Sequence, residues 1–323
     1  MSYILLGILA AFLLSMAVGA FRKSRLSHPR RPLPRGTGLA ARLAGHVAAL
    51  AVRIGERNPE HPAALAAAAA YVEGEFRKAG YSPLIQEYRL NSGERLQNVA
   101  AVLPGEGGSS PIFVVGAHYD TAPGTPGADD NASGVAALLE LAARLKARQG
   151  KIEIRFVAFS SEEPPYFGTD EMGSRHYAES LKSEGRKVLG MLSLEMLGFY
   201  SDAAGSQSYP PPLGLFYPDR GNFIALVSDL GSRKFLRRFA SECRPPRGTR
   251  VIASALPRLI PAITFSDHWQ FWRAGFAALM VTDTAFLRYP HYHQPTDLPE
   301  WLDFERMAEV VLGLEGAILA LTR

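Results

Sequence analysis

The sequence predicts an α/β fold, in which a mostly parallel central sheet carries helices on both faces. Short apolar runs alternate with amphipathic helical patterns along most of the chain, and this alternation is typical of parallel sheets. Polar side chains able to bind metal ions follow several of the apolar runs, as expected where strands end at one edge of such a sheet. The chain has 323 residues, 47% of them hydrophobic, which suffices for a large core, and α/β enzymes of this size are often one domain.

The first predicted element is an uncharged run of 19 residues at positions 3–21, which is long enough to cross a bilayer as one helix. The cations follow this run instead of preceding it, which argues against a secretory signal, although residues 18–20 (Val-Gly-Ala) would suit cleavage. We expect residues 1–21 to form a membrane anchor, with a cleaved signal and a buried core helix as the alternatives. The positive-inside rule then favours the rest of the chain on the cytoplasmic side, with export as the alternative.

A Pro- and Arg-rich segment at residues 22–37 is predicted to be a linker, because it lacks apolar periodicity. Six of the 35 Lys and Arg residues lie between positions 22 and 35, where no acidic residue occurs, so this segment accounts for the formal net charge of +4. Without it the 31 acidic residues outnumber the basic ones, and nucleic-acid binding is not expected. The single cysteine, Cys243, cannot form an intrachain disulfide and has no activating residue nearby, so we expect it to be structural.

The main domain is expected at residues 38–323 and begins with helical patterns over 38–55 and 62–79. The alanine-rich stretch 63–70 is typical of a good helix former, and Gly80 ends the second helix. The remaining periodicities predict strands at 84–90, 96–103, 112–116, 152–159, 188–196 and 277–282, and helices at 132–148, 171–184 and 304–321.

Residues with metal-binding side chains follow two of the predicted strands. His118 comes directly after a buried strand in VVGAHYD, with Asp120 two residues on. A histidine there is structural in many proteins, but a nearby carboxylate can accept its second ring proton, which fixes the tautomer and raises ligand basicity. Glu162 and Glu163 follow another strand, and adjacent carboxylates repel each other unless cations compensate. The alternative for the glutamate pair is a solvated loop.

Three more positions complete the set. Asp130 lies in PGADDNASG before a predicted helix, where helix capping is the alternative. Capping explains one acidic group, but it explains three polar residues in a Gly-flanked turn less easily. Glu195 interrupts the apolar run LGMLSLEML, and a charge in a buried strand needs a partner. His293 lies with His291 in the loop RYPHYHQPTD. Two imidazoles and several carboxylates form a donor set that suits a two-metal hydrolase.

These motifs resemble the zinc-dependent exopeptidases of the bacterial leucyl aminopeptidase and aminopeptidase Y type, peptidase family twenty-eight. The resemblance covers roughly residues 40–320 and rests on AHYD, PGADDNASG, the EE pair, SDHWQFW and YHQPTD in the family's order. It implies two zinc ions. One zinc would be held by His118, Asp130 and Glu195. The other would be held by Asp130, Glu163 and His293, so that Asp130 bridges the two ions.

The resemblance also implies roles for the remaining site residues. Glu162 would be the general base, and Asp120 would be the partner of His118. In related structures the peptide bond after the bridging aspartate is often cis, which here is the bond following Asp130. His268, in the SDH motif, matches no ligand position, and we expect it to line the site or to donate or accept a hydrogen bond. Trp269 and Trp272 are expected to contribute to packing.

The implied activity is that of a metallo-exopeptidase of the aminopeptidase type, which acts on peptide substrates with a metal-activated water. A glutaminyl cyclase, which shares the fold but uses one zinc, is an alternative. A non-catalytic receptor-like domain is a weaker alternative, because such proteins lose ligands and this chain keeps the set. Two departures from some relatives are Glu195 in place of aspartate and residues 164–166 (Pro-Pro-Tyr) in place of glycine. The preferred side chain, the choice among amino-, carboxy- and dipeptidase, the native metal and the oligomeric state stay open.

Overall fold

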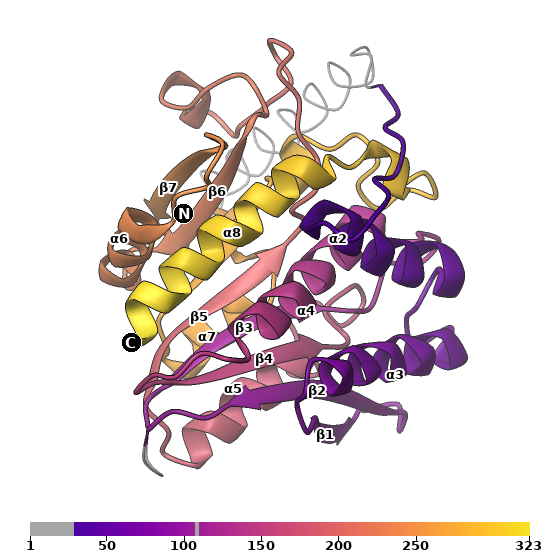
Figure 1. Ribbon diagram of the computed structural model, residues 1–323, viewed down its shortest axis with the longest axis vertical. Helices are drawn as coiled ribbons and strands as arrows, with labels where there is room; N and C mark the ends of the chain where they lie inside the picture. Colours follow the sequence, from indigo (N-terminus) through magenta and orange to yellow (C-terminus); the bar gives the residue numbers. More distant parts are fainter. Residues whose placement is uncertain (1–28, 107–109) are drawn as a thin grey trace, which may run out of the picture.

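An eight-stranded mixed sheet runs through the centre of the molecule, in the strand order β1-β2-β4-β3-β5-β8-β6-β7 (Figure 1). The computed structural model describes residues 29–106 and 110–323. The strands are β1 (Leu84–Arg89), β2 (Arg95–Leu103), β3 (Ile112–His118), β4 (Glu153–Phe159), β5 (Val188–Glu195), β6 (Phe223–Asp229), β7 (Arg250–Leu256) and β8 (Ala278–Thr282).

The central strands β4, β3, β5 and β8 pair in parallel, which confirms the predicted parallel centre of the sheet. On one side β2 and β1 join it in antiparallel pairings, and on the other side β6 runs antiparallel to β8. Because the four central strands point the same way, their carboxyl ends lie at one edge of the sheet, where functional groups are expected to gather.

Helices cover both faces of the sheet (Figure 1). The core on one side includes side chains of α2, α3, α4, α6 and α8, and the core on the other side includes those of α5 and α7. The helices are α2 (Leu39–Ala48), η1 (Ala49–Ile54), α3 (Pro62–Lys78), η2 (Ala128–Ser133), α4 (Gly134–Leu145), α5 (Gly173–Ser183), η3 (Leu213–Leu215), α6 (Arg233–Glu242), η4 (Pro261–Thr264), α7 (His268–Ala274), η5 (Ala285–Leu287), η6 (Pro299–Trp301) and α8 (Phe304–Thr322).

The two-sided cover explains the composition of the central strands. All seven residues of β3 are buried, as expected for a parallel strand with helices on each face, and no polar side chain occurs before its last residue, His118. The helix predicted at 132–148 begins at Gly134, because residues 128–133 form the separate turn η2 with non-helical backbone at Asp130 and Asn131. That irregular turn carries one of the predicted metal ligands into the site.

The sequence analysis missed β6, α6, β7 and α7. The strand β7 lies at the sheet edge and has no fully buried residue, so its apolar pattern is weak. The helix α6 buries only Leu236 and Phe239, and α7 has seven residues, fewer than periodicity needs for detection. The strands β6 and β7 extend the sheet and form one wall of a cavity described below.

The predicted anchor at residues 3–21 lies outside the described residues. Within residues 29–106 and 110–323, none of the helices is both long enough and apolar enough to cross a membrane. The end of the predicted linker lies against η6, where the Arg31 backbone N–H donates to the Glu300 carbonyl at 2.6 Å. The Arg30 guanidinium carbon lies 5.2 Å from the centre of the Trp301 ring.

Candidate metal centre

The predicted ligands meet at the carboxyl edge of the sheet, although they come from separate elements. His118 is the last residue of β3, and Glu195 is the last residue of β5. Glu162 and Glu163 lie in the loop after β4, and Asp130 lies in η2. His293 comes from the loop between η5 and η6. The direction of the strands therefore places the side chains of His118 and Glu195. The positions of the other proposed ligands depend on how the loops cross the sheet edge.

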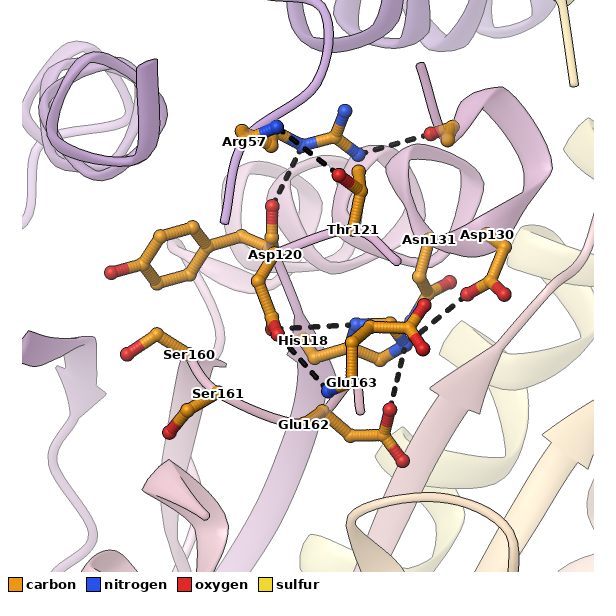
Figure 2. A network of polar contacts seen from close by, with 12 residues as sticks. Arg57, His118, Asp120, Thr121, Asp130, Asn131, Ser160, Ser161, Glu162 and Glu163 are labelled. Carbon is orange, nitrogen blue, oxygen red and sulfur yellow. Dashed lines mark hydrogen bonds and ion pairs between the residues drawn. The ribbon is translucent and has the colours of Figure 1, made fainter. Parts of the chain in front are cut away.

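The first cluster surrounds His118. Its Nε2 atom lies 3.3 Å from Glu195 Oε2 and 3.4 Å from Asp130 Oδ1. The Oε2 atom of Glu162 is more distant from the same nitrogen, at 3.9 Å. Figure 2 shows His118 at the centre of this group, with Asp130 and Glu162 directed toward its ring.

The second cluster surrounds His293. Its Nε2 atom lies 3.1 Å from Asp130 Oδ2 and 3.2 Å from Glu163 Oε2. Asp130 therefore directs one carboxylate oxygen toward each imidazole, because its Oδ1 faces His118. This is the arrangement that a bridging ligand needs.

The donor atoms fit metal binding. Three sets of side chains have ligand atoms within 4.8 Å of one another. Buried atoms without a hydrogen-bond partner among the described residues include both ring nitrogens of His118, Glu163 Oε1 and His293 Nε2. Buried polar atoms are rarely left without a partner, and imidazole nitrogens with carboxylate oxygens suit zinc. The three sets are His118–Asp130–Glu195, Asp130–Glu163–His293 and His118–Glu162–Glu163.

Burial and neighbouring charges together shift the pKa values of the proposed ligands. Burial disfavours the charged form of His118, but Glu162 and Glu195 outweigh it and raise the pKa of His118 well above its usual value. The pKa of His293 is raised to about 11, because contacts with Asp130 and Glu163 outweigh its burial. Burial and the Asp130 charge raise the pKa of Glu163 to about 7. Without metal, protons on the imidazoles compensate the carboxylates in place of cations.

Hydrogen bonds hold the ligands in position. The Ser266 hydroxyl donates to Glu195 Oε2 at 2.7 Å. The peptide bond between Asp130 and Asn131 is cis, as the resemblance implies. The Asn131 amide donates to the Leu194 carbonyl at 2.8 Å, and its oxygen accepts the Met196 backbone N–H at 3.1 Å. The turn that carries Asp130 is thereby joined to the end of β5.

Asp120 lies where its predicted role requires, with one difference. Its Oδ1 atom is 3.6 Å from His118 Nδ1, which is a close approach but longer than a hydrogen bond. Its Oδ2 atom accepts the backbone N–H of Glu163 at 3.1 Å (Figure 2). Asp120 therefore links the loop after β4 to the end of β3 in addition to facing the imidazole.

Two buried aspartates of this site were not singled out by the sequence analysis. Asp297 accepts the backbone N–H groups of Asp129 and Asp130, at 2.9 and 3.1 Å, and the Tyr289 hydroxyl at 2.8 Å. Asp267 is buried, and burial raises its pKa to about 7 while the charge of His118 opposes this. Both aspartates belong to motifs that carried the resemblance, YHQPTD and SDHWQFW, and this membership was the signal available.

His268 and the neighbouring tryptophans lie away from the ligands. His268 Nε2 is 2.7 Å from the Ile263 carbonyl, and burial lowers the pKa of His268 to about 4. The Trp272 indole is buried and donates to the Ala278 carbonyl at 3.0 Å. Trp269 packs against the same core, so the expectation of a packing role is confirmed. Cys243 is buried, which raises the pKa of its thiol to about 12, as expected for a structural cysteine.

An apolar cavity opens beside the ligands. Its empty volume is about 850 Å³ including its mouth, and Glu195 and Tyr292 are among its lining residues. The Tyr292 ring stacks on the His293 ring with a centroid distance of 3.8 Å, so the cavity adjoins both clusters. Strands β6 and β7 contribute the far wall. A cavity of this size and polarity is typical of a site for a small ligand or a substrate side chain.

Residues 98–314 match the sequence profile described as Peptidase family M28. An uncharacterized protein of Escherichia coli (strain K12), YfbL, is 41% identical, with 76% of this chain and 77% of that protein covered. A probable leucine aminopeptidase of Arthroderma otae is 27% identical over 66% of this chain. The alignment spans only 53% of that fungal protein.

Solved structures share the fold. BSAP, a zinc aminopeptidase from Bacillus subtilis, superposes with a TM-score of 0.69 at 18% identity, covering 91% of this chain and 97% of that chain. A glutaminyl cyclase from Fimbriiglobus ruber superposes with a TM-score of 0.63 at 20% identity, covering 91% and 99%. At these identities the likeness establishes the architecture, and the chemistry has to be argued from the side chains.

Proposed function

This chain belongs to peptidase family M28 and is a zinc-dependent peptidase, and we propose that it is a di-zinc aminopeptidase. The carrying observation is the position of Asp130, whose two carboxylate oxygens lie 3.4 Å from His118 Nε2 and 3.1 Å from His293 Nε2. An enzyme with a single zinc ion needs only one of these two clusters. A carboxylate that is shared by both clusters is instead what two zinc ions require. We propose that His118, Asp130 and Glu195 hold one zinc, and that Asp130, Glu163 and His293 hold the other.

We propose that Glu162 is the group that transfers a proton during hydrolysis. When bound, zinc supplies Lewis acidity that activates water and polarises a carbonyl group. Glu162 would accept the proton of the attacking water and deliver it to the leaving amine. Burial raises the pKa of Glu162 well above its usual value, as do Glu163 and Glu195, while His118 opposes this. A carboxylate with raised pKa suits a group that takes and returns a proton near neutral pH.

The charges around the centre favour an amino terminus over a carboxyl terminus. Besides the three carboxylates that would hold zinc, Asp120, Glu162 and Asp267 are buried at the site, so the site would stay negative with two zinc ions bound and would attract a peptide α-ammonium group. A carboxypeptidase needs a cation for the terminal carboxylate of its substrate, and none of the described residues that line the cavity is Lys or Arg. The apolar walls further favour a bulky apolar side chain on the first residue of the substrate.

The proposal is tested with the full chain saturated with zinc. Elemental analysis should find two zinc ions per chain, and leucyl and phenylalanyl amides should be hydrolysed. The matched N-acetylated amides should not react, because they lack the ammonium group. One zinc per chain, together with cyclisation of an N-terminal glutaminyl peptide, would refute the proposal in favour of a glutaminyl cyclase.

We also propose that the chain is held at a membrane by residues 1–21, with the peptidase domain on the cytoplasmic side. The support is the uncharged run at 3–21 and the basic segment after it. Protease protection in intact cells tests the orientation, since digestion of the domain from outside would contradict it.

A further inference from the structure

A buried arginine lies behind the metal centre, in the loop between η1 and α3. Arg57 has no solvent exposure. It precedes residues 98–314, which match the family profile. Figure 2 shows its side chain on the opposite side of His118 and Asp120 from Glu162. It therefore cannot touch a substrate at the mouth of the site, and any effect on the site must pass through other residues.

Arg57 is joined to the segment that follows β3. Its Nε donates to the Tyr119 carbonyl at 2.7 Å, and Tyr119 stands between His118 and Asp120. Its backbone N–H donates to Thr121 Oγ1 at 3.1 Å, and the Thr121 N–H donates to the Arg57 carbonyl at 3.1 Å. These bonds fix the chain on both sides of Asp120.

The same guanidinium is joined to the turn that leads to Asp130. Its Nη1 donates to the Pro126 carbonyl at 2.7 Å, and its Nη2 donates to the Gly127 carbonyl at 3.0 Å. Gly127 has a φ of 61°, and a Cβ there would lie 2.3 Å from the Asp130 carbonyl oxygen and 3.3 Å from Arg57 Nη2. The turn is thus packed between the guanidinium and the bridging ligand, with no room for a side chain at Gly127.

The charge of Arg57 also bears on the ligands. Arg57 donates five side-chain hydrogen bonds, and all five are accepted by backbone carbonyls. None of them is accepted by a carboxylate. Burial lowers the pKa of Arg57 to about 10, while Asp297 and Asp120 oppose this, and the group stays protonated at neutral pH. This fixed positive charge offsets the carboxylates of the metal-free site but repels a zinc ion, so Arg57 can support zinc binding only through its hydrogen bonds.

We propose that Arg57 is a positioning residue for both zinc sites, because it clamps the segment after His118 to the turn before Asp130. The loop that carries Arg57, between η1 and α3, then supports the metal centre, although it lies outside the span that matches the family profile. The inference rests on the metal-binding part of the proposed function and requires nothing about the substrate.

The test compares Arg57→Lys and Arg57→Met in the full chain, with Arg148→Met as the matched control. Arg148 also donates to backbone carbonyls, those of Ile152 and Thr322, but it lies at the end of α4. Zinc occupancy is measured against a chelator, and near-UV circular dichroism establishes that each variant is folded. Lysine keeps the charge but has only three donors, so Arg57→Lys should need about 10-fold more free zinc for half-occupancy, and Arg57→Met up to about 100-fold more.

A merely structural arginine would lower the melting temperature of the zinc-free protein and leave zinc binding of the folded protein unchanged. Unchanged zinc binding in folded Arg57→Lys therefore overturns the proposal, even if Arg57→Met fails to fold. An equal loss of zinc binding in Arg148→Met also overturns it. The readout uses no peptide, so a wild-type protein that binds two zinc ions without hydrolysing peptides would refute the aminopeptidase proposal and leave this one standing.

Discussion

Replacing Glu162 by glutamine removes a proton acceptor and preserves the size of the side chain. Its neighbour Glu163 offers a matched control, because the two residues are adjacent and are 6% and 4% exposed. Glu163 Oε2 lies 3.2 Å from His293 Nε2, whereas Glu162 Oε2 lies 3.9 Å from His118 Nε2. We expect Glu162→Gln to keep its zinc and lose turnover, and Glu163→Gln to lose zinc.

The magnitudes follow from these two roles. General acid–base catalysis contributes about 10²- to 10⁴-fold, so Glu162→Gln should raise the barrier by roughly 3–5 kcal/mol. Loss of an outer partner of a ligand weakens metal binding by about 10- to 100-fold, and loss of a ligand should cost at least as much. For Glu163→Gln we therefore expect weaker zinc binding at the second site. In competition with a chelator the zinc occupancy of that site should fall, before any effect is seen at saturating zinc.

The assay is kcat on a leucyl amide at saturating zinc, paired with zinc content by elemental analysis. Glu162 also belongs to a possible ligand set with His118 and Glu163, so the opposite assignment is chemically conceivable. If Glu162→Gln lost zinc while Glu163→Gln retained it and lost turnover, the assignment within the pair would be wrong.

Three further predictions concern the ligands, pH and the N-terminus. Asp130→Ala should lower zinc content at both sites, since its two oxygens face different imidazoles; loss of only one zinc would show that it does not bridge. Zinc affinity should rise with pH between about 6 and 9, because the pKa of His293 is about 11 without metal and zinc binds the neutral imidazole. Calorimetry in buffers of different ionisation enthalpy should detect the released protons, and a pH-independent affinity would contradict this. Deletion of residues 1–37 should give a soluble protein with similar turnover on small substrates, since the contacts it removes around Glu300 and Asp303 involve two exposed arginines, Arg30 and Arg31, and surface ion pairs contribute little; a large loss of turnover measured with leucyl amide would show that the linker matters to the site.

The order of the central elements could be predicted from local patterns. A continuous apolar run indicates a buried strand, and its last residue lies at the sheet edge whatever the rest of the chain does. This rule places His118 and Glu195 near that edge, but the roles of the five proposed ligands followed from the family resemblance. The strand β7 could not be found in the same way, because it is half-exposed and its pattern is weak. The strand β6 is almost wholly buried and begins with an apolar run, so the same rule applies to it and the sequence analysis overlooked it.

The supporting residues depend on contacts between distant segments. Arg57 meets the carbonyls of Tyr119, Pro126 and Gly127 at sequence separations of 62 to 70 residues. Asp297 meets the N–H groups of Asp129 and Asp130 from 168 and 167 residues away. An arginine in a loop or an aspartate in a turn is ordinarily a solvated residue. The motif YHQPTD was the signal available for Asp297, and nothing in the local sequence distinguishes Arg57.

The sequence by itself therefore determined which side chains stand at the ends of strands, because that depends on periodicity over a few residues. The resemblance implied that Asp130 bridges the two sites, but only the tertiary structure shows that Asp130 faces both His118 and His293, and that an apolar cavity lies beside Glu195. The site forms where two strand ends and three loops meet at one sheet edge. Their distances are set by packing over the whole molecule, which no local pattern encodes.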